Sequence, residues 1–79
     1  MKREEILENV QNMVGRLSDR EECPPDLDLM DEAGLSSIEI MELLCSLEDT
    51  YGVKIAPRDL RLVATVEDLA GLVWEKLKP

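Results

Sequence analysis

Residues 36–52 read S-S-I-E-I-M-E-L-L-C-S-L-E-D-T-Y-G, and this stretch decides the fold. Its apolar residues recur every three to four positions, which is the period of an amphipathic helix. Ser36 and Glu39 have the S-x-x-E spacing of a capping box, in which each side chain accepts a hydrogen bond from the other residue's backbone N–H. Gly52 is typical of the residue that ends a helix in the left-handed conformation. We therefore predict a helix that begins at the two serines and ends at Tyr51.

This helix has two apolar faces, whereas one face is enough for a small bundle. At about 100° per residue, the wider face is typical of a core stripe; it holds Ile40, Leu43, Leu44, Leu47 and Tyr51. The narrower face, here called the second stripe, consists of Ile38, Met41 and Cys45. Carboxylates flank it and form an acidic rim of Glu42, Glu48 and Asp49. Three interpretations stay open: the second stripe is a docking surface for a basic partner, the helix is buried on both sides, or Met41 and Cys45 lie at the edge of the core.

Ser37 lies beside the second stripe in the first turn of this helix, where its hydroxyl can face solvent. A serine at a helix start is usually a cap. Here Ser36 can supply the cap, which leaves Ser37 without a necessary structural task. The hydroxyl of Ser37 is therefore available for a task other than capping.

On the N-terminal side, residues 2–18 repeat apolar side chains at helical spacing and predict a first helix. Gly15 interrupts this helix and suggests a close approach of a second helix. Pro24 and Pro25 prevent any continuation, so residues 19–35 are predicted to form a loop. Loops of this length are uncommon in compact domains and are often functional. We expect core contacts from Leu27, Leu29 and Met30, and water-facing carboxylates at Asp26, Asp28, Asp31 and Glu32.

On the C-terminal side, residues 53–56 are predicted to be extended, and a proline opens a single helical turn over 57–60. Thr65 caps a final helix, with Asp68 three residues further on. Strand signals are too weak to build a sheet. The predicted fold class is therefore all-α: a small helical bundle of three main helices plus one short helix, in a single domain over 1–79.

The composition excludes most catalytic classes. A chain of 79 residues has little room for a deep cleft. It contains no histidine and only two cysteines, which excludes a Ser-His-Asp triad, a histidine-containing zinc site and a four-thiolate metal site. We predict that the protein is not an enzyme and holds no metal.

The net charge of −9 comes from 18 acidic and 9 basic residues. A field of this sign repels nucleic acids and anionic membranes, and it attracts basic protein surfaces. The first ten residues have no uninterrupted apolar stretch, and no run in the chain approaches membrane-spanning length. We expect a cytoplasmic monomer with both cysteines reduced, which binds neither nucleic acid nor the membrane interior.

The pattern resembles the phosphopantetheine-binding carrier proteins, and specifically the acyl carrier proteins. The common form of that family is G-L-D-S-L, followed by E-L, L-E-E and F-G-I at fixed spacings from the serine. This chain has G-L-S-S-I at 34–38, E-L at 42–43, L-E-D at 47–49 and Y-G-V at 51–53. In addition, T-V-E-D-L at 65–69 resembles the opening of the family's last helix.

The resemblance implies that Ser37 is the attachment site of 4′-phosphopantetheine. A separate phosphopantetheinyl transferase provides it from coenzyme A: the serine hydroxyl attacks the pyrophosphate, and adenosine 3′,5′-bisphosphate leaves. The thiol of the arm then holds acyl groups as thioesters for enzymes of fatty-acid or specialised polyketide-type biosynthesis. We place the contacts with basic docking surfaces of these enzymes at Ser36, the second stripe and the acidic rim.

One position departs from the family pattern. The aspartate that usually precedes the attachment serine helps to engage the transferase, and here that position is Ser36. The departure favours a specialised pathway over a housekeeping one. A second hypothesis therefore stays open, in which the protein is an unmodified acidic helical interaction module that docks a basic partner through the second stripe. Only the carrier hypothesis requires a hydroxyl at Ser37.

Overall fold

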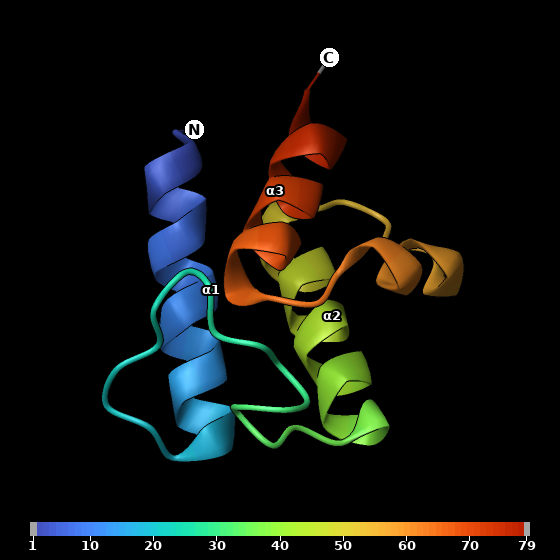
Figure 1. Ribbon diagram of the computed structural model, residues 1–79. Helices are drawn as coiled ribbons and strands as arrows, with labels where there is room; N and C mark the ends of the chain where they lie inside the picture. Colours follow the sequence, from blue (N-terminus) through green and yellow to red (C-terminus); the bar gives the residue numbers. More distant parts are fainter. Residues whose placement is uncertain (1, 79) are drawn as a thin grey trace.

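The computed structural model describes residues 2–78 as helices joined by irregular segments (Figure 1). The helices are α1 (Arg3–Ser18), α2 (Ser37–Tyr51), the 3₁₀-helix η1 (Pro57–Leu62) and α3 (Val66–Leu77). Over this described part of the chain the only β-type pairing is an isolated bridge between Asp28 and Thr65. The predicted all-α class, with three main helices and one short one, is confirmed.

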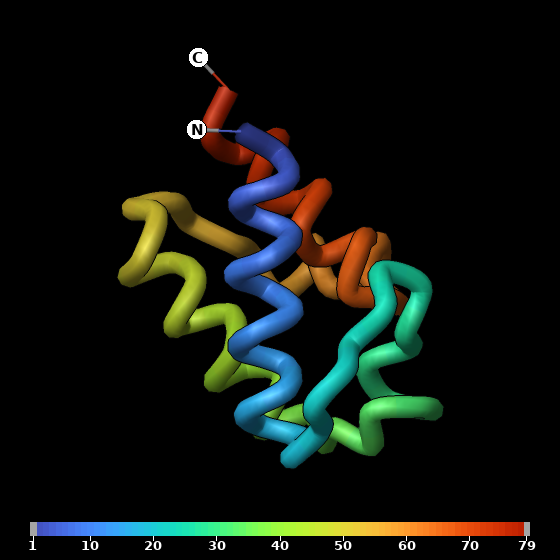
Figure 2. The backbone as a smooth tube through the Cα atoms, turned by 90° about the vertical axis from the view of Figure 1, so that its left-hand side faces the viewer, coloured from blue at the N-terminus to red at the C-terminus, as the bar shows by residue number. Residues whose placement is uncertain are grey.

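The first and last helices form the main packing interface. α1 packs chiefly against α3, and the start of α1 and the end of α3 lie at the same end of the molecule (Figures 1 and 2). In Figure 1, η1 lies at the edge of the molecule opposite α1. One core joins all the main helices, and its fully buried large side chains are Ile6, Val10, Val14, Leu29, Leu43, Leu47, Val66, Leu69 and Val73. Each such side chain contributes about 1.5–3 kcal/mol when it leaves water.

The segment between α1 and α2 is long but well anchored. Its backbone exchanges hydrogen bonds with the start of α3, from the N–H of Leu29 to the carbonyl of Ala64 at 2.9 Å and from the N–H of Val66 to the carbonyl of Leu27 at 3.0 Å. Leu27 and Leu29 are buried, as predicted. The expected core contact of Met30 is wrong, because its side chain is 52% exposed.

The local turn explains the outward position of Met30. The Asp28 carboxylate accepts hydrogen bonds from the N–H groups of Met30 and Asp31 at 3.0 and 2.8 Å. This side-chain-capped turn is typical of aspartate. It directs Leu29 inward and leaves Met30 at the surface. Asp28 itself is half-buried and does not simply face water as expected.

Gly15 does mark a close approach, but the neighbour is the following loop and not a second helix. A Cβ atom at this position would lie 2.9 Å from the carbonyl oxygen of Arg20. The chain comes back because Asp19 adopts the left-handed conformation, with φ of 56°. The N–H of Arg20 then donates to the carbonyl of Gly15 at 2.9 Å. The expectation of a helix–helix contact is corrected accordingly.

η1 extends to Leu62, two residues beyond the predicted turn over 57–60. Its start is held by Asp59, whose Oδ2 accepts from the N–H of Ala56 at 2.9 Å and lies 3.1 Å from the Nζ of Lys76. No residue of η1 is fully buried. The short helix is therefore attached to the body by one carboxylate and by partly buried Leu60.

α3 begins as predicted. Thr65 is its N-cap, and its Oγ1 accepts from the N–H of Asp68 at 3.1 Å while the Asp68 carboxylate accepts from the N–H of Thr65 at 3.2 Å. None of the described helices has the length and apolar character needed to cross a membrane. Both thiols are free; Cys23 is buried and Cys45 is exposed.

Candidate functional site

The N-terminus of α2 is built by the predicted capping box. The Oγ of Ser36 accepts a hydrogen bond from the N–H of Glu39 at 3.2 Å, and Oε1 of Glu39 accepts from the N–H of Ser36 at 3.0 Å. Ser37 is the first residue of the helix, and its side chain is exposed. The two serines therefore differ in role: the hydroxyl of Ser36 is engaged in the cap, and the hydroxyl of Ser37 faces solvent.

Two preceding residues fix the direction in which Ser37 points. Gly34 has φ of 72°, a conformation that side-chain-bearing residues rarely adopt. Leu35 is buried, and its N–H donates to the carbonyl of Leu29 at 2.9 Å. Leu35 and Ile40 flank the cap at the N′ and N4 positions and both belong to the core, which is the arrangement of a hydrophobic staple. These contacts anchor the start of α2 to the core.

The second stripe lies at the surface. Ile38 is 73% exposed and Met41 is 44% exposed, and Cys45 is also exposed. The wider face of the same helix is buried, with Ile40, Leu43, Leu44 and Leu47 in the core. The interpretation that α2 is buried on both sides is therefore wrong.

The acidic rim is only partly free. Glu42 and Asp49 are exposed. Glu48 is half-buried, and its Oε2 accepts a hydrogen bond from the N–H of Ile55 at 2.9 Å. This contact holds the segment that leaves α2, a structural role that the sequence pattern did not reveal. Together with Glu39, these carboxylates are the only charged side chains of α2, which has no cation.

An apolar groove of about 330 Å³ opens beside Ser37. Its walls come from α2, from the turn after Asp28 and from the segment around η1; the lining residues are Asp28, Leu29, Met30, Asp31, Ser37, Ile40, Met41, Leu60, Val63 and Ala64. The sequence pattern missed this groove because its walls are far apart along the chain. The only local signal was the presence of two apolar residues, Leu60 on η1 and Val63 directly after it.

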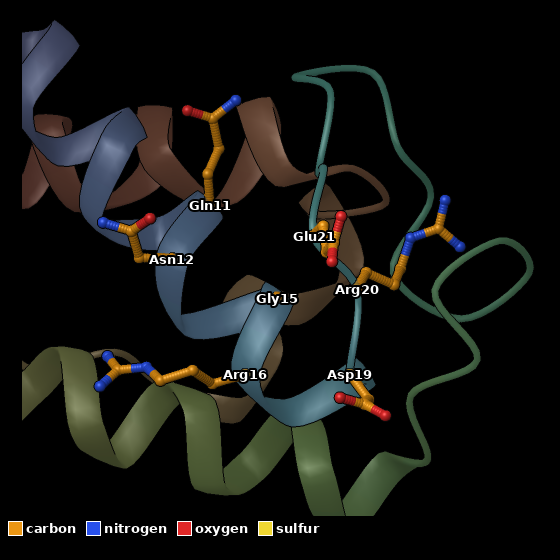
Figure 3. Close-up of a pocket in the computed structure, with 7 residues that line it drawn as sticks. All are labelled: Gln11, Asn12, Gly15, Arg16, Asp19, Arg20 and Glu21. Atoms are coloured by element: carbon orange, nitrogen blue, oxygen red, sulfur yellow. The ribbon is translucent and has the colours of Figure 1, made fainter.

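A larger hollow of about 580 Å³ lies elsewhere, between the end of α1 and the following loop (Figure 3). It is lined mainly by polar and charged side chains, which point away from one another. Arg20, on its edge, donates to the carbonyl of Glu32 at 3.2 Å and so serves to fasten the loop. The hollow shares no lining residue with the groove beside Ser37. In residues 2–78 no group of three or more cysteine or carboxylate side chains is placed to hold a metal ion.

Comparisons with known proteins agree on one family. The family model described as "Phosphopantetheine attachment site" matches residues 4–73. An acyl carrier protein of Exiguobacterium is 33% identical over 79 residues, covering 98% of this chain and 100% of the relative. An acyl carrier protein of Thermotoga maritima is 29% identical over 77 residues, covering 95% of each chain. The solution structure of holo acyl carrier protein from Geobacter metallireducens is similar with a TM-score of 0.74 and 29% identity, covering 90% of this chain and 84% of that one.

Proposed function

Since the chain belongs to the phosphopantetheine-binding acyl carrier proteins, we propose that Ser37 is the residue that carries the 4′-phosphopantetheine arm. Proteins of this family are carriers without catalytic activity of their own. They depend on a phosphopantetheinyl transferase and on acyl-handling enzymes. When bound, the arm supplies a terminal thiol that holds acyl groups as thioesters.

The observation that carries this proposal is the exposed hydroxyl of Ser37 beside an already capped helix end. The first-turn N–H groups of a helix lack intrahelical acceptors, and the helix dipole favours negative charge there. The start of α2 can therefore stabilise a phosphodiester attached to Ser37. Because Ser36 provides the cap, modification of Ser37 leaves the capping box intact.

The groove beside Ser37 supports the role of acyl carrier. It opens at the attachment residue, and most of its lining side chains are apolar. Met30 and Met41, whose side chains are flexible and polarisable, stand at its surface. Such a groove can shelter the apolar part of an acyl group from water.

Ser37→Ala and Ser36→Ala separate the attachment residue from the cap. On incubation with coenzyme A, Mg²⁺ and a broad-specificity transferase, Ser37→Ala is expected to show no mass increase. Ser36→Ala is expected to be loaded but to be less stable by about 1 kcal/mol, because the cap is lost. Loss of loading in Ser36→Ala with retention in Ser37→Ala would contradict the assignment.

The second stripe and the exposed part of the acidic rim are proposed to dock the basic surfaces of partner enzymes. Met41→Ala should slow the loading of Ser37 but cost far less stability than the ~2–5 kcal/mol typical of an emptied core site. Leu44→Ala, on the buried face of the same helix, is the matched control and should destabilise the bundle strongly. Equal destabilisation by both substitutions would show that Met41 acts as a core residue.

We place the protein in the cytoplasm as a single carrier domain over 1–79, serving fatty-acid or polyketide-type biosynthesis; the serine at position 36 favours a specialised pathway. An intact mass of the protein from its native cell tests the carrier function directly. A mass increased by acyl-phosphopantetheine would support the carrier and identify its cargo. An unmodified mass would instead favour the acidic interaction module.

A further inference from the structure

Positive charge is concentrated in one short part of this acidic protein. Residues 53–64 carry three cations against one carboxylate, a net of +2, whereas the whole chain has a net charge of −9. We call the exposed part of this segment the basic lobe; it consists of Lys54, Arg58, Arg61 and Leu62. η1 provides three of these four residues.

The side chains of the basic lobe are free to meet a partner. All four are exposed, and Leu62, at 75%, is the most exposed large apolar residue of the described chain. The ion pairs of residues 2–78 join Lys76 to Asp59 and Lys78 to Glu75, so the three cations of the lobe take part in neither. Asp59, the one carboxylate of the segment, is engaged with Ala56 and Lys76.

Two walls of the groove that opens at Ser37 come from α2 and from the segment around η1, the short helix that carries Arg58, Arg61 and Leu62 of the basic lobe. Ile40 and Met41 of α2 line one side, and Leu60 and Val63 line the side of η1. α2 contains four carboxylates and no cation. A protein that covers Ser37 and the groove therefore meets negative charge on the side of α2 and positive charge on the side of η1; Figure 1 shows where the two helices lie.

We propose that the basic lobe is a docking element for a partner enzyme whose surface presents carboxylates around an apolar socket. Charge complementarity identifies the partner's surface as acidic, and Leu62 provides the apolar group that fills the socket. Nucleic acids and anionic lipids are less favourable ligands of the basic lobe than an acidic protein surface, because the net charge of −9 repels both. This inference rests on the proposed function, since the partner is one that reaches the arm on Ser37.

Opposite charges on the two sides of the groove also fix the orientation of the complex. A partner with a basic patch opposite α2 and an acidic patch opposite η1 can bind in only one orientation relative to the groove. The reversed rotation places like charges against each other at both sides. Such an arrangement excludes wrong partners and wrong orientations more than it raises affinity.

Photo-crosslinking of the full chain in its native cell tests the inference. Leu62 is replaced by p-benzoylphenylalanine, and the crosslinked peptide of the captured protein is sequenced by mass spectrometry. We expect a discrete product whose crosslinked segment carries more acidic than basic residues. Arg58→Glu combined with Arg61→Glu should lower its yield about tenfold or more. Reversing the acidic residues of that partner segment to lysine should restore the yield.

Two controls make the result specific. The photoreactive residue at position 67, which is exposed in the first turn of α3, should not give the same product. Arg3→Glu combined with Arg16→Glu changes the net charge equally but lies on α1, and it should leave the yield from position 62 unchanged. At about 0.15 M salt, where repulsion between carboxylates is largely screened, the charge variants should keep the thermal unfolding midpoint, because the side chains of Arg58 and Arg61 are exposed.

Three outcomes would each overturn the inference. The crosslinked segment could carry a net positive charge, the yield could be unaffected by Arg58→Glu combined with Arg61→Glu, or position 62 could give only the product that position 67 also gives. An intact mass from the same sample separates this failure from failure of the proposed function. A sample with phosphopantetheine on Ser37 but no acidic contact at position 62 overturns only the docking element. A sample without the arm overturns the proposed carrier function and this inference with it.

Discussion

Ser36 and Ser37 are identical residues in adjacent positions, and the helix start gives them different environments. The hydroxyl of Ser36 accepts the N–H of Glu39 at 3.2 Å, and the hydroxyl of Ser37 is exposed. The spacing to Glu39 already allowed this distinction to be predicted, because a capping box is a local pattern. The sequence therefore already distinguished the serine that caps the helix from the serine whose hydroxyl is free.

Ser36→Asp should restore the carboxylate that is usual in the family. Aspartate is a good N-cap, and its negative charge is favourable at a helix N-terminus. We expect equal or greater stability in urea unfolding and faster loading by a housekeeping transferase, measured by mass spectrometry over time. Ser36→Asn is the matched control, since it keeps the cap without the charge. Equal loading rates for Ser36→Asp and the unchanged protein would show that the carboxylate is not needed.

Gly15→Ala should destabilise the protein although alanine favours helix. The new Cβ would lie 2.9 Å from the carbonyl oxygen of Arg20, which is backbone and cannot turn away. We expect a loss of about 1–3 kcal/mol in urea unfolding, as for an overpacked site. In Gly71→Ala the Cβ would meet only the flexible end of Arg3 at 3.5 Å. That control should gain up to about 1 kcal/mol, and equal effects of both changes would contradict the crowding at Gly15.

At the scale of the helices, capping residues in the sequence predicted where the helices begin and end, because these boundaries depend on local hydrogen bonds. α2 begins after Ser36 and ends before Gly52, which has φ of 65°, and α3 begins after Thr65. In contrast, Asp59, which holds the start of η1, forms an ion pair with Lys76, a residue distant in the sequence. The outward position of Met30 follows from the hydrogen bonds of the local turn at Asp28, whereas the groove beside Ser37 depends on contacts between segments far apart in the chain. Period and capping patterns carry no information about such contacts.

The start of α3 should be sensitive to acid. The N–H of Ala64 donates to the carboxylate of Asp68, and this bond, with further bonds from Thr65, lowers the pKa of Asp68 below its ordinary value of 3.8. Because the folded state favours the ionised form, the stabilisation is complete above 3.8 and is lost as the pH falls through the lowered pKa. Acid should therefore weaken the hydrogen bonds that Ala64 and Thr65 donate to Asp68 at the start of α3.

Asp68→Ala should lower the free energy of unfolding at pH 7 by about 1 kcal/mol, because hydrogen bonds to Thr65 and Ala64 are lost. The difference from the unchanged protein should shrink as the pH falls below 3.8. Urea unfolding at a series of pH values measures both effects. Glu67→Ala, in the same turn, removes only a charge near the helix dipole and should cost less. A difference that grows in acid would contradict the role of the ionised carboxylate.

For the whole molecule, the dominant electrostatic feature is self-repulsion. A net charge of −9 is confined within principal extents of 33 × 24 × 19 Å. Salt at about 0.1 M screens charges over about 10 Å, so it weakens repulsion between carboxylates across the molecule. We expect the thermal unfolding midpoint to rise between about 0.01 M and about 0.15 M salt.

The same series with sucrose at matched osmolality should give a smaller rise, since a neutral solute does not screen charge. The double variant Arg58→Glu/Arg61→Glu, which removes the two cations of η1, should show a steeper salt dependence than the unchanged protein. A midpoint that falls with salt would mean that attractive pairs outweigh the repulsion. Scanning calorimetry is the suitable measurement.

The packing of α1 against α3 has a consequence for how the protein is made. The first helix leaves the ribosome early, but its main partner is the last helix of the chain. The anchoring hydrogen bonds of the segment before α2 also end on residues near the start of α3. A nascent chain that lacks α3 therefore has an unpaired apolar face on α1 and an unanchored loop. The bundle therefore cannot close until α3 has been synthesised, and the start of α2 reaches its folded form only once α3 is available.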